Sequence, residues 1–235
     1  YHLLWAATAE EETSGQNGVA SVLPHLGTVA LGVVGEPTGM QMAVAEKGLM
    51  VLDCTARGRT GHAARDEGEN ALYRALDDIG WFRTYRFSKV SEHLGPVKMQ
   101  VTQIEAGTQH NVVPDRCRFV VDVRTTECYS NQETLRIIKE HVASEVNPRS
   151  TRLNPSGLSL DHPVVRRGLA LGLTTYGSPT LSDQALMPFP TLKIGPGDSA
   201  RSHTPDEYIR PDEIRAGAET YVRLLSGLEV PNSSR

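Results

Sequence analysis

The sequence has little of several features that would each assign a class of protein. It has only 3 cysteines in 235 residues, and Cys54, Cys117 and Cys128 show no CxxC spacing. They cannot all pair with one another, which is typical of reduced thiols in a cytoplasmic protein. Lysine and arginine total 24 against 28 aspartates and glutamates, a net charge of −4 without a long basic run. We therefore expect no nucleic-acid partner and no membrane partner, and no apolar run approaches the roughly 18–20 residues that span a bilayer.

The first residues have the pattern of a domain interior. Tyr1 is not a start methionine, and neither a basic segment nor a small-residue cleavage site indicates a signal peptide. Residues 3–7 are apolar throughout, which predicts a buried strand. We therefore expect the chain to lack its N-terminal part.

Changes in hydrophobic periodicity divide the chain into three blocks, 1–47, 48–153 and 154–235. The first block combines the apolar run 3–7, a short helix within 16–26 and a second apolar run at 29–35. Runs that are apolar on both faces suit the central strands of an α/β sheet. The last block returns to this pattern, with a helix capped by Asp161, a strand at 190–194 and a helix beginning at Pro211.

The middle block has a different order of elements. Alternating and helical spacings predict strands at 49–57, 97–105, 117–124 and 149–153, with helices at 68–85 and from Ser130 to about Val146. Ser130 and Glu133 fit a capping box. The resulting β-α-β-β-α-β order is that of a ferredoxin-like unit. The sequence thus predicts an α/β domain interrupted by a smaller inserted domain.

Acidic side chains follow the first apolar run. Glu10, Glu11 and Glu12 lie in the segment TAEEETSG, where three adjacent carboxylates repel one another. At the carboxyl edge of an α/β sheet they would lie where ligands bind. A divalent cation would offset the repulsion, with one carboxylate as ligand and its neighbour as base. Acidic residues at a helix N-terminus are the alternative.

Two further residues are candidate metal ligands. Glu36 follows the run 29–35 and is held by Pro37, whose φ is fixed. His203 lies in a loop after Gly195-Pro196-Gly197, and histidine is a frequent zinc ligand. Taken singly, the first also fits a strand-exit turn and the second a surface loop.

Three residues of the inserted block suit recognition of an anion or a polarised carbonyl. His62 precedes a predicted helix, Asn111 lies between two predicted strands, and Arg124 ends a strand. Arginine can bind a carboxylate through two parallel hydrogen bonds. Each residue singly also fits a cap, a turn or a salt bridge.

The motifs together occur in the order and spacing of one family. TAEEETSG, GEPT, GHAA, NVVPD followed by DVR, and GPG followed by SHTPDEYI extend from Thr8 to Tyr208. The sequence resembles the dinuclear-zinc aminoacylase/carboxypeptidase family, which includes acetylornithine deacetylase, succinyl-diaminopimelate desuccinylase, glutamate-type carboxypeptidases and aminoacylase. The resemblance implies a zinc-peptidase-like α/β catalytic domain, incomplete at its N-terminus, with an inserted ferredoxin-like α+β lid and dimerisation domain.

The resemblance also implies roles for individual residues. Glu11 matches the general acid/base, Glu12 and His203 match ligands of one zinc, and Glu36 matches a ligand of the other. His62 matches the lid histidine that reaches the partner's active site in dimeric members. The remaining matches are to substrate-binding positions: Asn111 and Arg124 in the lid, with Arg124 for the substrate carboxylate, and Ser178, Thr180 and Ser182 in a loop that ordinary turn chemistry also explains.

By this resemblance the parent protein hydrolyses an N-acyl amino acid, foremost N-acetyl-ornithine in arginine biosynthesis, as a homodimer formed through the inserted domain. The expected cofactor is two zinc ions per site, with cobalt or manganese as substitutes. The family also needs an upstream His and a bridging Asp, which this chain lacks, so we expect the chain itself to be weakly active or inactive. The alternatives are a zinc carboxypeptidase or dipeptidase, an N-succinyl-ornithine or diaminopimelate desuccinylase, and a non-catalytic dimerisation relative. A Cys or Ser hydrolase is disfavoured because there is no G-x-S-x-G motif.

Overall fold

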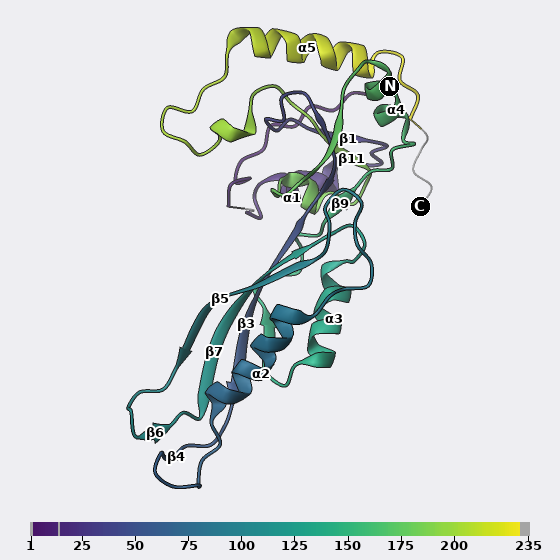
Figure 1. Cartoon of the computed structure of the whole chain (residues 1–235). Helices are drawn as coiled ribbons and strands as arrows, with labels where there is room; N and C mark the ends of the chain where they lie inside the picture. Colours follow the sequence, from purple (N-terminus) through teal and green to yellow (C-terminus); the bar gives the residue numbers. More distant parts are fainter. Residues whose placement is uncertain (1, 14, 231–235) are drawn as a thin grey trace. The chain divides into compact units, whose positions relative to one another are not determined.

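The computed structural model describes residues 2–13 and 15–230. The chain forms two compact units (Figure 1). Unit 1 comprises Tyr1–Lys47 and Ser156–Arg235, and unit 2 comprises Gly48–Pro155. Among the described residues, no helix combines the length and apolar character needed to cross a membrane.

Unit 2 is built on a four-stranded antiparallel sheet in the order β5-β7-β3-β8. Its strands are β3 (Gly48–Arg57), β5 (Lys98–Ala106), β7 (Arg116–Thr125) and β8 (Glu145–Pro148). Helices α2 (Ala71–Thr84) and α3 (Asn131–His141) lie on the same side of this sheet (Figure 1). The short strands β4 (Gly61–His62) and β6 (Val112–Val113) pair with each other.

The core of unit 2 follows from the alternation of apolar residues that the sequence shows. Cys117, Phe119, Val121 and Val123 alternate along β7, and all four are buried and pack against α2 and α3. The capping box of Ser130 and Glu133 is confirmed. All three cysteines are free.

The predictions for the end of this unit were wrong by several residues. Helix α3 ends at His141, not near Val146, because the Asp78 carboxylate accepts hydrogen bonds from the Ala143 and Ser144 amides. The chain then leaves the helix in time for Val146 to pair with Cys54 of β3. The last strand is therefore β8 at 145–148, not 149–153.

Unit 1 contains a five-stranded mixed sheet in the order β1-β11-β2-β10, with β9 also paired to β2. Its strands are β1 (Gly32–Val34), β2 (Met42–Glu46), β9 (Ser156–Gly157), β10 (Thr175–Ser178) and β11 (Thr191–Lys193). The α-helices are α1 (Val19–Val22), α4 (Pro163–Ala170) and α5 (Pro211–Leu225), and the 3-10 turns are η1 (Leu23–His25), η2 (Asp183–Leu186) and η3 (Ser199–Arg201). Met42, Val44, Leu192, Ile194 and Leu224 form the centre of the core. The predicted α/β class is confirmed.

The predicted strand at 3–7 is absent from the structure. These residues have no regular secondary structure, and the side chains of Leu3 and Trp5 are 85% and 91% exposed. An apolar run becomes a strand only where a neighbouring strand satisfies its backbone groups, and none of the described strands lies beside this run. Helix α4 is also capped by His162 and not by Asp161, because Pro163 occupies its first position.

Candidate active site

The three adjacent glutamates of TAEEETSG have three different environments. Glu10 has a φ of +59°, and its carboxylate accepts hydrogen bonds from the backbone and side-chain nitrogens of Asn17, each at 3.0 Å. Those hydrogen bonds lower the pKa of Glu10. The carboxylate of Glu10 is therefore occupied by hydrogen bonds within its own turn. The side chain of Glu11 is half-buried, and that of Glu12 is exposed.

Glu11 lies in an acidic region of unit 1. Its pKa is raised to about 7, mainly by burial and in addition by the negative charges of Glu36, Asp183, Glu12 and Glu46. Burial also raises the pKa of Glu36, which the positive charge of Lys193 opposes. The predicted site residues Glu11 and Glu36 are therefore close enough for the charge of Glu36 to raise the pKa of Glu11.

Asp183 is a member of this region that the sequence analysis did not select. Its carboxylate accepts a hydrogen bond from Thr8 Oγ1 at 3.3 Å, and burial raises its pKa. It lies at the start of η2, directly after the predicted substrate loop. This hydrogen bond therefore connects the N-terminal segment, which carries Glu11, to the end of the loop.

Glu12 and His203, which are predicted to share a metal ion, lie close to each other. Glu12 Oε2 lies 3.9 Å from His203 Nε2, and both side chains are about three-quarters exposed. His203 follows η3 with a φ of +60°, and its amide donates to the Glu207 carboxylate at 3.0 Å.

These residues do not complete a metal centre. Across residues 2–13 and 15–230, no three or more His, Cys, Asp or Glu side chains are grouped closely enough to hold a metal ion. The donor set of Glu12, Glu36 and His203 is thus insufficient by itself for the two zinc ions that the resemblance implies.

The predicted substrate loop surrounds a buried ion pair. Lys193 Nζ lies 2.6 Å from Glu46 Oε2, and the two side chains are 3% and 1% exposed. Ser178 and Ser182 are buried, and their hydroxyls bond Lys193 and Glu46 respectively, whereas Thr180 is exposed. Contact between these three residues and a substrate stays a prediction.

The sequence carried a signal for this pair that was not used. Glu46 follows the apolar stretch Met42–Ala45, and Lys193 interrupts the apolar run of the predicted strand 190–194. A charge inside a buried strand needs a partner of opposite sign. The sequence therefore shows that Lys193 needs an acidic partner, but it does not identify Glu46 as that partner.

Unit 2 brings two of its three predicted site residues together. His62 on β4 pairs with Val112 on β6, and the Ala63 amide donates to the Asn111 carbonyl at 2.9 Å. His62 Nδ1 accepts from the Ala64 amide, which orients the exposed ring. Asn111 is therefore adjacent to the segment that carries His62.

Arg124 lies at the other end of the sheet of unit 2. It is eight positions along β7 from Arg116, the end near which β4 and β6 pair, and its guanidinium binds Asp122 at 2.8 and 3.0 Å. At about 3.3 Å per residue, this separates the two ends by roughly 26 Å. One copy of unit 2 cannot place His62 and Arg124 on the same small substrate.

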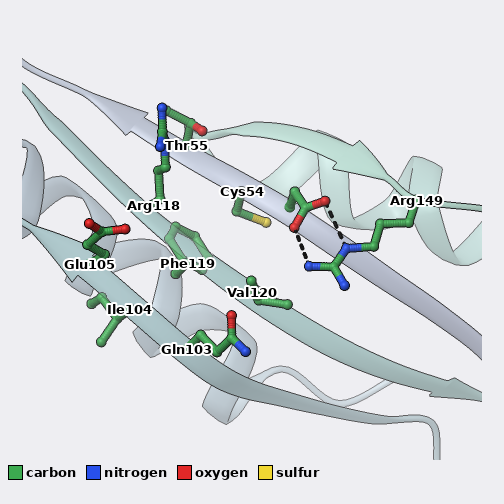
Figure 2. A pocket seen from close by; sticks show the side chains of 10 residues that line it. Cys54, Thr55, Gln103, Ile104, Glu105, Arg118, Phe119, Val120 and Arg149 are labelled. Carbon is green, nitrogen blue, oxygen red and sulfur yellow. Dashed lines mark hydrogen bonds and ion pairs between the residues drawn. The ribbon is translucent and has the colours of Figure 1, made fainter.

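A shallow pocket of about 510 Å³ lies on the sheet of unit 2 (Figure 2). Asp53 and Arg149 pair across one side of it, and Arg118 and Glu105 project from the neighbouring strands. None of the predicted site residues lines this pocket. The candidate active site is therefore assigned to the acidic region of unit 1.

The chain is similar to known proteins in sequence. Residues 44–150 match the peptidase dimerisation domain. Curated relatives include succinyl-diaminopimelate desuccinylase of Paracoccus denitrificans, 26% identical over 95% of this chain and 65% of that protein. Acetylornithine deacetylase of Myxococcus xanthus is 26% identical over 90% of this chain and 61% of that protein. The chain thus spans about three-fifths of the length of these relatives.

Solved structures share the fold. Aminopeptidase PepT from Bacillus cereus superposes with a TM-score of 0.71 at 20% identity, over 92% of this chain and 62% of that one. A dinuclear metal binding peptidase of the M20 family from Bacillus subtilis gives a TM-score of 0.61 at 17% identity, over 91% and 61%. The chain therefore contains a peptidase dimerisation domain at residues 44–150 and shares its fold with solved M20 peptidases.

Proposed function

We propose that the complete protein hydrolyses the amide bond of an N-acyl amino acid, with N-acetyl-ornithine as the first candidate substrate. The observation that carries this proposal is the half-buried Glu11 within a group of carboxylates on unit 1. Relatives named acetylornithine deacetylase and succinyl-diaminopimelate desuccinylase support the class of substrate.

Glu11 suits proton transfer in such a reaction. A carboxyl group with a pKa of about 7 can both accept and return a proton near neutral pH. In the proposed reaction, Glu11 accepts a proton from water as the water oxygen attacks the acyl carbonyl. It then returns the proton to the amine as the C–N bond breaks, so that a carboxylic acid and a free amino acid leave.

Unit 2 would supply binding groups from two copies of the chain. Because His62 and Arg124 lie at opposite ends of its sheet, a site that uses both must combine two protomers. The match of residues 44–150 to a dimerisation domain supports this arrangement. We propose a homodimer in which His62 and Asn111 act on the partner's site, where His62 stabilises the developing oxyanion.

The role of Glu11 is tested in the protein expressed from its complete gene. Glu11→Gln keeps the shape of the side chain but cannot accept the proton, so we expect kcat to fall at least about 100-fold. Glu10→Gln is the matched control, because Glu10 is bound to Asn17 and should retain the rate within about threefold. A Glu11→Gln enzyme with the wild-type kcat would contradict the assignment.

The substrate class is tested with a panel of N-acetyl-ornithine, N-succinyl amino acids and dipeptides. We expect the highest kcat/KM for an N-acyl amino acid, and a preference for dipeptides would instead support the peptidase alternative. Arg124→Ala should raise KM at least about tenfold with little change in kcat, since it removes the guanidinium that we propose binds the substrate carboxylate. Elemental analysis of the purified protein tests the prediction of zinc independently of activity.

A further inference from the structure

The buried ion pair of Glu46 and Lys193 lies between the sheet of unit 1 and the loop at 178–182. Glu46 is on β2 and Lys193 is on β11, and both strands are otherwise almost wholly buried. Met42, Val44 and Leu192 on the same strands belong to the apolar core. An ion pair at such a position is not explained by core packing alone.

Every polar atom of the pair has a partner. Glu46 Oε1 accepts from the Ser182 amide at 2.9 Å, and Oε2 accepts from Ser182 Oγ at 2.7 Å. Lys193 Nζ donates to Ser178 Oγ at 2.8 Å and to the Thr180 carbonyl at 3.3 Å. The two charges therefore hold both ends of the loop.

A buried ion pair contributes little net stability, because desolvation of the two charges cancels most of their attraction. Replacing both partners by apolar residues of similar size often leaves stability unchanged. The pair is better explained by the conformation that it imposes, because its hydrogen bonds hold one loop in a single position.

The loop leads directly into the candidate active site. Ser182 caps η2, and the next residue, Asp183, accepts a hydrogen bond from Thr8 beside the segment that carries Glu11. Gln184 fixes the other side of η2 through Thr191 of β11 at 2.9 Å. A displacement of Ser182 would therefore move Asp183 relative to Glu11.

We propose that Glu46 and Lys193 are positioning residues of the active site: they fix the 178–182 loop, and through it Asp183, against the segment that carries Glu11. The inference rests on the proposed function for its effect on turnover, but the clamp on the loop does not depend on any activity.

The test uses the protein expressed from its complete gene and its double variant Glu46→Leu/Lys193→Met, which leaves neither buried charge unpaired. We expect a melting temperature close to that of wild type, amide hydrogen exchange at 180–186 at least about tenfold faster, and kcat at least about tenfold lower with KM changed less. The matched control is Asp53→Leu/Arg149→Met, which removes an exposed ion pair of unit 2 and should change none of these values.

Wild-type exchange at 180–186 in the double variant would overturn the clamp. Faster exchange with an unchanged kcat would overturn the positioning role. If wild-type protein hydrolyses no member of the substrate panel, the proposed function fails, while the exchange measurement still decides whether the pair holds the loop. The single variant Lys193→Arg retains the positive charge. It should therefore exchange at 180–186 more slowly than the double variant and keep a higher kcat, and a variant that does neither also counts against the proposal.

Discussion

At the scale of single residues, identical side chains differ in chemistry because their surroundings differ. Glu10, Glu11 and Glu12 are consecutive, yet one bonds its own turn, one is half-buried among other carboxylates and one lies beside His203. The resemblance to a family assigned roles to Glu11 and Glu12, but nothing in the run of three glutamates distinguishes them physically from Glu10. Burial and charge provide that reason.

Asn131 is the residue whose loss we expect to cost unit 2 the most stability for its size. Its side chain is fully buried, accepts from Thr125 Oγ1 at 2.7 Å and donates to the Leu153 carbonyl at 2.8 Å. Asn131→Ala leaves the buried Thr125 hydroxyl without its acceptor and the Leu153 carbonyl with the Leu49 amide as its remaining donor, and should lower the free energy of unfolding by about 2–3 kcal/mol.

Urea unfolding of Asn131→Ala checks this value, with the exposed neighbouring change Gln132→Ala as control. The control should stay within about 0.5 kcal/mol of wild type. Equal losses in the two variants would show that the hydrogen bonds of Asn131 carry no special weight.

At the scale of elements, sequence patterns correctly predicted the strands that pair with neighbouring strands in a regular sheet. The alternation along β7 identified its buried face correctly, because β3 and β5 flank it on both sides. The run 3–7 is more apolar, but no described strand pairs with it, and it is exposed. Strand β2 was missed although it is entirely buried, because five residues are too few to show a period.

The start of helix α5 should contribute to the pH dependence of stability. Glu213 accepts hydrogen bonds from Arg201 Nη1 and the Arg210 amide, both at 2.8 Å, and the bond from Arg201 is the main reason that its pKa falls to about 2. A carboxylate with a lowered pKa contributes stability that is present above its unfolded value near 4.5 and is lost as the pH falls through about 2.

Glu213→Gln removes this contribution. The variant should be less stable than wild type at pH 7, and the difference should shrink between pH 4.5 and 2. Thermal unfolding across this range tests the expectation, with the exposed Glu219→Gln on the same helix as control. A difference from wild type that stays constant down to pH 2 would contradict the assignment.

At the scale of the whole molecule, the candidate groups are divided between two units. Unit 1 holds the carboxylates and His203, whereas unit 2 holds His62, Asn111 and Arg124. The roughly 26 Å between the ends of β7 means that a single small substrate cannot contact all three residues of one unit 2. A dimer is therefore part of the proposed site and not an addition to it.

Subunit mixing tests this composition. His62→Ala and Glu11→Gln, each weakly active alone, should regain about a quarter of the wild-type rate when mixed, because half of the re-formed dimers are mixed and each has one intact site. Mixing Glu11→Gln with Glu36→Ala is the control, since both changes lie in unit 1 and no intact site can form. Absence of recovery in the first mixture would refute the shared site.

The sequence by itself determined the α/β class, the helices and alternating strands of unit 2, and the segments that carry Glu11, Glu36 and His203. These follow from local periodicity, caps and motif spacing, which neighbours in the chain control. Only the tertiary structure decided that residues 3–7 are exposed, that Asp183 joins Glu11, that Arg124 lies far from His62, and that Glu46 pairs with Lys193 across 147 positions. These depend on contacts between residues distant in sequence, where burial and charge act through space and leave little trace in the local pattern.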